Sequence, residues 1–546
     1  MRQYLQPLNP TKDERHKLLR NSLKEVDRLE DYENIIKLLG VPEDITSIAK
    51  EGEFKDIKIG IIGAGLAGLS SAFELRKLGC DITIFDPIED RVGGRVYTHY
   101  FDKDKKYYGE LGPMRIPISH DVTWHYINLF NLNTRPFIQY NENAYIYVRD
   151  TRVKNDPKGK NVMEKIYPQF NLREWERNTP WMELAEHGLV KPLYSIYPQN
   201  RKDILRIREK YNPQILYWDK LNIRQVLELS GLSQEAIDLL GRLMPLAGSF
   251  YYINYMEVLE EEYPLYFSYL YEIIGGFSHL PNAFYKSLSS QNPKEYDNSI
   301  KNIGKVKFKL GNYVSGIYRS NKHNKVILKF KDKTSSEFQE EFDYVVCAIP
   351  FSALRAVEIY PSFTNRKMQA IRELNYSNSQ KTLFLCNRRF WEEDGIKGGG
   401  SYTDLPIASI WYPSDFNKDR GVLLASYNFN LESTRLGSLE DNIRFEEIKR
   451  QVEKVNGKRR GYLDDIVEDY KTIQWDTEPW FRGAFCRFTP EQKRIFSYSA
   501  ASSEYNDRVF FAGEHISPNH GWMQGALSTG MKAANDIAKN IKKGLS

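Results

Sequence analysis

The chain has 546 residues, of which 41% are hydrophobic and 27% charged, and its 77 basic and 72 acidic side chains leave a net charge of +5. This length predicts two or three domains, and the composition is that of an ordinary globular protein. Lysines are interleaved with acids, as in the run KDKK over residues 103–106, which favours a solvated mixed surface over a nucleic-acid-binding face.

Cellular location is predicted from features that the sequence lacks. The first residues, MRQYLQPLNPTKDERHKLL, contain no apolar segment typical of a signal peptide, and the most apolar stretch, residues 57–73, is interrupted by Lys58 and four glycines. The four cysteines, Cys80, Cys347, Cys386 and Cys486, are far apart and form no CxxC pair. We therefore expect a cytoplasmic protein in a reducing compartment, with no disulfide framework, no zinc site and no membrane partner.

The first part of the chain is predicted to be helical and then to form a βαβ unit. Residues 1–54 are expected to be an N-terminal helical extension, because residues 29–39 place apolar side chains at helical spacing and Gly40 is a natural stop. Residues 57–62 form a short buried strand, a glycine-rich turn leads into a helix over residues 66–78, and residues 81–85 form a second strand.

The turn of this unit carries the glycine pattern that is typical of dinucleotide-binding folds. Gly63 permits a tight turn, Gly65 lets the backbone approach a pyrophosphate, and Gly68 allows the helix to pack closely against the strand. Ala67 belongs to the helix start, whose free N–H groups bind the pyrophosphate. Asp86 ends the second strand 18 residues after Gly68, where its carboxylate can accept a hydrogen bond from a ribose hydroxyl.

The run RVGGR over residues 91–95 follows directly. Two glycines, including Gly94, and then Arg95 suggest backbone amides and a cation that face more phosphate. An NAD-dependent dehydrogenase has no need of this extension, so the run favours FAD as the cofactor.

The rest of the chain alternates between helical and strand-forming regions. Residues 120–285 are expected to be largely helical, with helical periodicity over 221–229 and 236–240 and Ser233 as an N-cap. Residues 304–350 have strand patterns at 305–310, 325–330 and 344–349, and residues 355–480 form a second mixed region. Residues 509–513 form a buried strand that leads through a glycine-rich turn into a final helix.

Both ends of the chain therefore carry strand–glycine–helix units, and the simplest architecture brings them together in one nucleotide-binding domain. The predicted fold is α/β, with a Rossmann-like FAD-binding domain, a mixed-sheet substrate domain and a helical domain. The FAD-binding domain is assigned residues 55–120, 286–354 and 486–546; residues 121–285 are mainly helical and contribute to the substrate lobe, and residues 355–485 form the substrate-binding domain.

The run GELGPMRIP over residues 109–117 resembles a segment of the flavin amine oxidases, and within them of the L-amino acid oxidases. The resemblance implies that Arg115 pairs with the α-carboxylate of the substrate, and the guanidinium fork suits such an ion. A purely structural alternative is that Arg115 pairs with an internal acid.

Two strand residues are assigned roles by the same resemblance. The run SQKTLFLC over residues 379–386, followed by FWEED, is similar to the family strand whose lysine faces flavin N5 through a water, which implies this role for Lys381. The alternative is an edge lysine in solvent. Tyr427 falls, with a shift of one residue, near a family tyrosine that assists carboxylate binding.

The C-terminal run FAGEH over residues 511–515 and the run HGWMQGA over residues 520–526 also resemble the family. The resemblance implies that Glu514 binds the flavin side chain, that Gly521 and Trp522 wall the substrate at the flavin face, and that the following helix N-terminus stabilises the anionic reduced flavin. Trp480, in the run EPWFRGA, matches a family position against the flavin ring.

The candidate residues fall into three groups. Catalytic candidates are Lys381, Arg115, Tyr427 and Trp522, and substrate-binding candidates are Arg115, Tyr427, Gly521 and Trp522. Cofactor-binding candidates are Gly63, Gly65, Ala67, Gly68, Asp86, Gly94, Arg95, Gly112, Pro113, Met114, Arg115, Val314, Trp480, Gly513, Glu514, Trp522, Met523 and Ala526. No metal site is expected, because neither His515 nor His520 has cysteines or acids at ligand spacing.

One segment departs from the family. Some L-amino acid oxidases place a histidine over the flavin from the segment before residues 272–276, whereas this chain has LEEEY at 259–263. We expect Glu260, Glu261 and Glu262 to form a solvated helix turn, and the tyrosine-rich residues 263–271 to favour apolar or aromatic substrates. The alternative is that an acid points inward and pairs with a basic substrate side chain.

The predicted function is the FAD-dependent oxidative deamination of L-amino acids to 2-oxo acids, ammonia and hydrogen peroxide. The partners are then a small-molecule L-amino acid and dioxygen, and a homo-oligomer stays open. Three alternatives remain: an amino-acid 2-monooxygenase that decarboxylates the imino acid to an amide, a monoamine or polyamine oxidase, and a flavoprotein without turnover.

Overall fold

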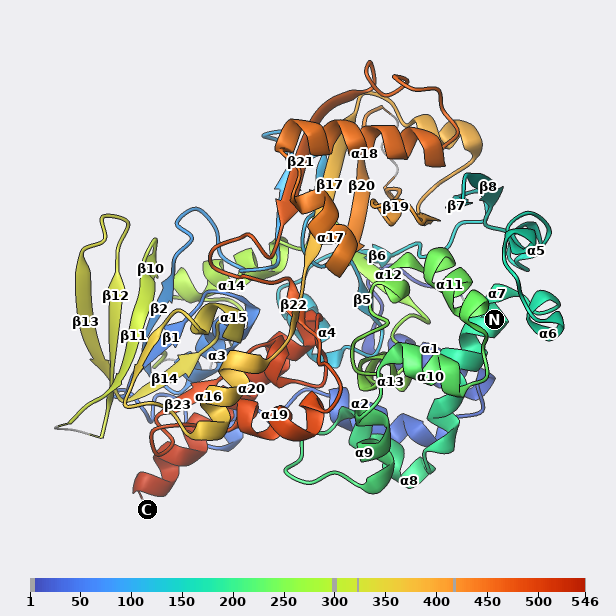
Figure 1. Cartoon of the computed structure of the whole chain (residues 1–546). Helices are drawn as coiled ribbons and strands as arrows, with labels where there is room; N and C mark the ends of the chain where they lie inside the picture. Colours follow the sequence, from blue (N-terminus) through green and yellow to red (C-terminus); the bar gives the residue numbers. More distant parts are fainter. Residues whose placement is uncertain (1–4, 297–301, 322–323, 416–418, 546) are drawn as a thin grey trace.

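The computed structural model describes residues 5–296, 302–321, 324–415 and 419–545. Residues 1–4 and 546, at the ends of the predicted extension and of the last FAD-binding segment, lie outside the described residues, as do 297–301, 322–323 and 416–418 inside the predicted middle segments. Figure 1 shows three regions: a sheet domain that holds β1 and β2, a second sheet domain around β17 and β20, and a helical lobe around α10 and α13.

A parallel five-stranded sheet is the centre of the first domain. Its order is β10-β2-β1-β14-β23, and neighbouring strands are parallel throughout. The strands are β1 (Lys58–Ile62), β2 (Asp81–Asp86), β10 (Val306–Leu310), β14 (Tyr344–Cys347) and β23 (Val509–Phe511). They come from the first, middle and last parts of the chain. The prediction that both chain ends meet in one nucleotide-type domain is therefore confirmed.

Both faces of this sheet are covered, which explains why β1, β14 and β23 are nearly continuous apolar runs. On one side lie α3 (Leu66–Lys77) and α20 (Met523–Leu545), which approach so closely that Ser71 Oγ donates to Gly530 O at 2.9 Å. On the other side lies a four-stranded sheet of order β13-β12-β11-β15, whose Leu328 and Phe342 contact Gly60. Its strands are β11 (Tyr313–Arg319), β12 (Val326–Lys331), β13 (Glu337–Phe342) and β15 (Glu358–Tyr360).

The second domain is built on a seven-stranded sheet of order β21-β17-β20-β19-β18-β7-β8. Its central strands are β17 (Ser379–Cys386), β20 (Gly421–Phe429) and β21 (Val467–Gln474), and α17 (Asn430–Gly437) and α18 (Asp441–Val455) accompany them. The remaining strands are β18 (Gly400–Thr403), β19 (Ser409–Trp411), β7 (Tyr145–Val148) and β8 (Thr151–Lys154).

Strands β7 and β8 come from residues 121–285, which the sequence predicts to be mainly helical. They form a hairpin whose turn, Arg149 and Asp150, has positive φ at both residues, and β7 pairs in parallel with β18. The hairpin was missed because its strands have only four residues each and because its first strand is buried at every position, so no alternation marks it. Part of the predicted helical segment therefore belongs to the substrate domain's sheet.

The helical lobe contains α10 (Ile223–Leu229), α11 (Gln234–Leu243) and α13 (Met256–Glu262). Ser233 accepts a hydrogen bond from the Ala236 backbone at the start of α11, so the predicted N-cap is confirmed. Other helices of this region are α4 (Asp121–Leu129), α5 (Lys160–Lys165), α6 (Glu174–Arg177), α7 (Trp181–Ala185), α8 (Pro198–Arg201), α9 (Pro213–Asp219) and α12 (Pro245–Gly248). A small sheet of β5 (Ile116–Pro117), β9 (Leu270–Ile273) and β6 (Thr134–Pro136) borders the lobe.

The N-terminal extension is helical, as predicted: it forms α1 (Lys12–Glu25) and α2 (Tyr32–Leu39), of which the periodicity of residues 29–39 indicates the second. It is bound to the helical lobe at two places: Arg15 pairs with Asp121 of α4 at 2.6 Å, and Arg28 donates to the carbonyl oxygens of Glu262 and Tyr263 at 3.0 Å each. The extension therefore holds the end of α13 in place.

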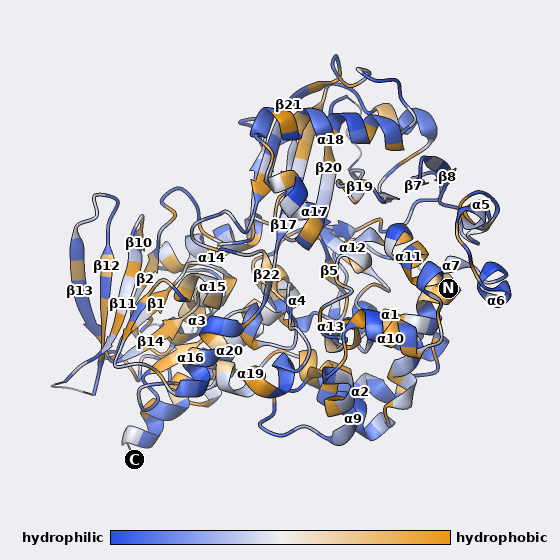
Figure 2. Ribbon diagram, viewed as in Figure 1, coloured by the Kyte–Doolittle hydropathy of each residue, from blue (hydrophilic) through white to orange (hydrophobic). Residues whose placement is uncertain are grey.

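The remaining elements connect these regions. They are the helices α14 (His279–Ser289), α15 (Phe351–Leu354), α16 (Asn365–Glu373) and α19 (Gln492–Ala501), and the strands β3 (Thr98–Tyr100), β4 (Tyr108–Glu110), β16 (Tyr376–Ser377) and β22 (Phe485–Cys486). In Figure 2 the parallel strands are mostly orange, whereas α18 and β13 are largely blue. Within the described part of the chain, every helix is too short or too polar to cross a membrane.

Candidate active site

A cavity of about 460 Å³ opens at the carboxyl ends of the parallel strands. Its wall includes the last residues of β1 and β2, Ile62 and Asp86, together with Gly63, Ile349 and Gly513, which follow β1, β14 and β23. Ligands of open parallel sheets bind at this edge, where the N-terminal ends of the following helices supply free N–H groups. The place of the cavity therefore suits a dinucleotide.

The glycine turn has a shape that only glycine permits. Gly63 has φ +103°, a conformation that other residues rarely adopt. Gly65 is the N-cap of α3, and no side chain forms a capping hydrogen bond there. A Cβ atom built on Gly65 would have no other atom within 4 Å. A Cβ on Gly68 would lie 2.0 Å from Gly63 O, so this glycine permits the close approach of α3 to the strand. The turn therefore leaves open space beside an uncapped helix N-terminus.

Asp86 lies on the cavity wall and is buried. Its carboxylate accepts hydrogen bonds from Ala64 N at 2.7 Å and from Ile88 N at 3.0 Å, which holds the glycine turn against β2. Burial raises the pKa of Asp86 above its ordinary value. Each carboxylate oxygen keeps a lone pair for a further donor, as a ribose hydroxyl would be.

Arg95 and Glu514 join the first and last parts of the chain on the wall of the cavity. Arg95 Nη1 lies 2.8 Å from Glu514 Oε1 and also donates to Ala484 O at 2.9 Å. Glu514 accepts further hydrogen bonds from Cys486 N at 3.1 Å and Gly521 N at 2.9 Å. Arg95, which the sequence predicts to face phosphate, is thus paired with an internal acid, and this pair fixes the loop that carries Gly521.

The residues present fit FAD. The wall includes the predicted cofactor residues Gly63, Gly65, Ala67, Asp86, Gly94, Arg95, Gly112, Pro113, Val314, Trp480, Gly513, Glu514, Trp522, Met523 and Ala526. An uncapped helix start and the open space at Gly65 suit a pyrophosphate, and the largely apolar remainder suits flat ring systems. Gly68, Met114 and Arg115 do not line this cavity: Gly68 packs under the turn, and Met114 is buried beside Lys381.

Lys381 projects from β17 into the cavity wall and is only 2% exposed. Its Nζ donates to Gly112 O at 2.6 Å and to Glu110 O at 3.3 Å and lies 4.3 Å from the centre of the Tyr427 ring. Burial lowers the pKa of Lys381 to about 7, Glu110 raises it and Arg115 lowers it further. The alternative of an edge lysine in solvent is wrong.

Tyr427 lies opposite Lys381 in the register of β17 and β20 and also lines the cavity. Burial raises the pKa of Tyr427, and the nearby cations Arg115 and Arg487 lower it. The phenol is therefore protonated at neutral pH and can donate a hydrogen bond.

Arg115 is half-buried and surrounded by rings. Its guanidinium carbon lies 5.3 Å from the ring centre of Trp411, 5.5 Å from Phe267 and 6.0 Å from Phe137, and Nη1 donates to Gln139 Oε1 at 2.8 Å. Within the described residues no carboxylate forms an ion pair with Arg115. The alternative that Arg115 pairs with an internal acid is therefore wrong for the described residues.

Glu260, Glu261 and Glu262, at the end of α13, are not a solvated turn, which corrects the sequence prediction. Glu260 is 3% exposed and lies 2.7 Å from Lys493, and Glu261 lies 2.7 Å from Arg487. Glu262 is partly buried, and burial raises its pKa to about 7. For Glu260 and Glu261 the reason is that Lys493 and Arg487, which follow β22 far along the chain, supply the cations that a buried acid requires.

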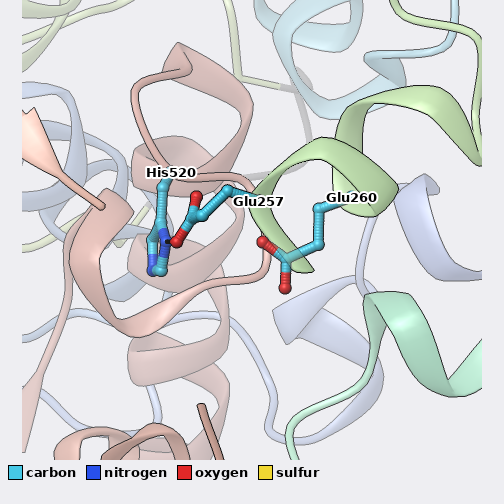
Figure 3. Close-up of side chains that lie close together, drawn as sticks. All are labelled: Glu257, Glu260 and His520. Atoms are coloured by element: carbon cyan, nitrogen blue, oxygen red, sulfur yellow. Dashed lines mark hydrogen bonds and ion pairs between the residues drawn. The ribbon is translucent and has the colours of Figure 1, made fainter. Parts of the chain in front are cut away.

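Glu257, one turn earlier on α13, meets His520 with Nδ1 and Oε1 at 2.8 Å (Figure 3). With Glu260 these residues place potential metal ligand atoms within 4.8 Å of one another, although His520 has no acid near it in the sequence. Arg487 pairs with Glu257 at 2.9 Å and Lys493 pairs with Glu260 at 2.7 Å, so the charges of both acids are already compensated by side chains of the protein.

Sequence reasoning missed several residues of this region. Trp475, Tyr313 and Phe485 line the cavity, and Gln139, Phe267 and Trp411 surround Arg115. Trp475, five residues before Trp480, is an aromatic neighbour of a recognised motif and could have been selected on that ground. Gln139 and Phe267 carry no local signal, because only the fold brings them to Arg115.

Comparisons with known proteins agree with this geometry. A family model described as flavin containing amine oxidoreductase matches residues 66–538. The chain is 29% identical over 528 residues to the L-amino acid oxidase bordonein-L of Crotalus durissus terrificus, covering 95% of this chain and 92% of that protein. It is 28% identical over 520 residues to the L-amino-acid oxidase of Vipera ammodytes ammodytes, covering 95% and 99%. A structure of putrescine oxidase bound to putrescine matches with a TM-score of 0.67 and 17% identity over 88% of this chain and 98% of that chain, a likeness in fold alone.

Proposed function

This chain belongs to the flavin-containing amine oxidoreductases and uses FAD, and from that premise we propose that it oxidises the α-amino group of L-amino acids, giving a 2-oxo acid, ammonia and hydrogen peroxide. The observation that carries the proposal is the unpaired guanidinium of Arg115. A partly buried cation without a counter-ion is unfavourable, and a substrate carboxylate removes that cost by forming a bidentate pair.

This site gives each side chain a part in the reaction. Arg115 holds the α-carboxylate, and the Tyr427 hydroxyl is available as a second donor to it. Trp522 and Gly521 lie on the cavity wall and limit where the substrate can rest. Bound FAD supplies the acceptor for the Cα hydride and is reoxidised by dioxygen. A substrate held at two points keeps its reacting carbon in a near-attack position, where a displacement of about 1 Å can cost on the order of 10²-fold in rate.

Lys381 serves as the proton-holding group of the site. Because burial lowers the pKa of Lys381 to about 7, it can gain or lose a proton at neutral pH. Its ammonium form also places a positive charge on the wall of the cavity, where charge assists the reduction of oxygen. The two carbonyl oxygens of Glu110 and Gly112 fix the position of Nζ.

Two alternatives use the same chemistry differently. A monoamine or polyamine oxidase would have no carboxylate to place at Arg115, which disfavours it. An amino-acid 2-monooxygenase would use the same carboxylate clamp, and it differs in the fate of the imino acid, so only the products separate it from an oxidase.

The test compares matched substrates that differ only in the carboxylate. We expect peroxide release with L-phenylalanine and L-lysine, and little or none with phenethylamine and 1,5-diaminopentane. Mass spectrometry should find the 2-oxo acid, whereas an amide would identify a monooxygenase. Turnover of the amines at rates equal to those of the amino acids would overturn the proposal.

Location and assembly remain predictions. All four cysteines are free and buried, which is compatible with the proposed cytoplasmic location. Cell fractionation would test that location, and light scattering would test for a homo-oligomer.

A further inference from the structure

Helix α13 holds the loop that walls the flavin face. Glu257 and Glu261 are four residues apart and so lie on one side of the helix, facing the loop that contains His520, Gly521 and Trp522. Glu257 Oε1 lies 2.8 Å from His520 Nδ1, and Trp522 Nε1 donates to Glu261 Oε1 at 3.0 Å. The two acids therefore bind the residues on either side of Gly521.

Arg487 joins the two acids. Its Nη1 lies 2.9 Å from Glu257 Oε2 and its Nη2 lies 2.7 Å from Glu261 Oε1. One guanidinium thus spans both carboxylates, and all three side chains are at most 18% exposed. Charge-assisted hydrogen bonds of this kind, shielded from water, hold a fixed geometry.

The loop is also held at the cofactor site, where Gly521 N donates to Glu514 Oε2 at 2.9 Å. On the side of the helical lobe, the Asn519 side chain accepts a further hydrogen bond from Tyr266 Oη. The loop is therefore fixed between Glu514 at the FAD cavity and the segment of α13 in the helical lobe.

Ring packing alone does not fix the indole of Trp522. His120, Tyr266 and Phe267 contact it at ring-centre distances of 5.1, 5.4 and 5.9 Å, in edge-on or tilted arrangements. Such contacts restrict the plane of the indole ring. The orientation of the ring within that plane is set by the hydrogen bond that its N–H group donates. In the described structure Glu261 accepts that hydrogen bond.

We propose that Glu261 is a positioning residue: held by Arg487, its carboxylate fixes the indole of Trp522 and so sets the wall against which the substrate is oxidised. The kinetic part rests on the proposed function, because it assumes that Trp522 walls the substrate. The structural part, a fixed indole, does not.

The first test reads the indole directly and needs no substrate. The holoenzyme is labelled with ¹⁵N-tryptophan, and Trp522→Phe assigns the Trp522 signal among the nine indole signals. In Glu261→Leu the indole proton should move upfield, because it loses a hydrogen bond to a carboxylate. In Glu261→Gln, which keeps an acceptor oxygen, most of the shift should be restored.

Glu260→Gln is the matched control. It removes the neighbouring carboxylate of the same helix, which pairs with Lys493 and makes no contact with Trp522, so the Trp522 signal should stay in place. An unchanged signal in Glu261→Leu, or an equal shift in the control, would overturn the proposal. If Glu261→Leu fails to fold, Glu261→Gln and Glu261→Ala carry the comparison.

The second test is a double-mutant cycle on the rate of flavin reduction by a saturating L-amino acid. Glu261→Leu should slow reduction about tenfold with normal FAD content, and in a Trp522→Phe background the same change should alter the rate by less than about twofold. Additive effects would show that Glu261 does not act through Trp522. A protein that turns over no amino acid would contradict the proposed function. The structural part of the proposal, a fixed indole, would then be decided by the NMR test alone.

Discussion

At the scale of single residues, the site is defined by two cations whose surroundings differ. Arg115 lies among aromatic rings and forms no ion pair with a carboxylate of the described residues. Lys381 is buried, which lowers its pKa to about 7, so its charge depends on the pH near neutrality. The first is suited to binding an anion, and the second to exchanging a proton near neutral pH.

Replacing Arg115 tests the carboxylate clamp. In Arg115→Leu we expect KM for L-amino acids to rise sharply, because the loss of a desolvated charged pair costs on the order of 2–5 kcal/mol. FAD content should stay normal, because Arg115 does not line the cofactor cavity. Steady-state kinetics and the flavin absorbance measure both. Arg135→Leu, which removes a partly buried arginine whose partner is Glu272, controls for the loss of a cation, and unchanged kinetics in Arg115→Leu would disprove the assignment.

From the lowered pKa of Lys381 we predict how the rate of flavin reoxidation changes with pH. Its pKa is lowered from 10.5 to about 7, so the ammonium is present below pH 7 and lost as the pH rises through 7. If the charge assists oxygen reduction, the rate constant of flavin reoxidation should fall over that interval. In Lys381→Met it should be pH-independent over the same range and lower by about 10²-fold or more.

Stopped-flow measurement of the two half-reactions separates these effects. A variant that loses only substrate binding, with normal reoxidation, would contradict the role of Lys381.

The lowered pKa of Lys381 also has a consequence for stability. Between pH 7 and 10.5 the unfolded chain binds more protons at this group than the native protein, so this group makes the free energy of unfolding rise with pH there.

At the scale of elements, the start of α3 separates two functions of glycine that the sequence motif combines. Gly68 lies against the backbone of Gly63, whereas Gly65 faces open space at the cavity. We therefore expect Gly68 to be required for packing and Gly65 for binding the cofactor.

Two alanine variants should tell these roles apart. In Gly68→Ala the new Cβ meets Gly63 O, and we expect the apoprotein to lose about 1–3 kcal/mol of stability because the backbone must move. In Gly65→Ala the φ of −75° suits alanine and no atom is near, so apoprotein stability should be unchanged while FAD binds more weakly. Thermal unfolding of the apoprotein and titration with FAD measure the two effects. Equal behaviour of the two variants would disprove this division.

At the scale of the whole molecule, the active site lies where three regions meet. The FAD domain supplies Glu514 and the loop of Trp522, the second sheet domain supplies Lys381 and Tyr427, and the helical lobe supplies Glu257 and Glu261. The N-terminal extension is bonded to the end of α13 through Arg28. Helical segments remote in sequence therefore take part in holding the loop that contains Trp522.

The sequence by itself determined the βαβ unit, its glycine turn and the choice of FAD, and resemblance added Arg115, Lys381 and the C-terminal run. These features could be predicted because each one depends on a few neighbouring residues: a φ value, a strand of apolar residues or a motif of fixed spacing. The helices α10 and α11, with the cap at Ser233, were predictable for the same reason.

Only the tertiary structure decided which charges are paired. Glu261 and Arg487 are separated by 226 residues, and Glu260 and Lys493 by 233, so no local pattern could show that the acids of α13 point inward. The unpaired state of Arg115 and the joining of β7 and β8 to the substrate sheet are likewise results of long-range packing. A charged side chain can be buried only where a partner of opposite sign is brought to it, and that partner is supplied by the fold.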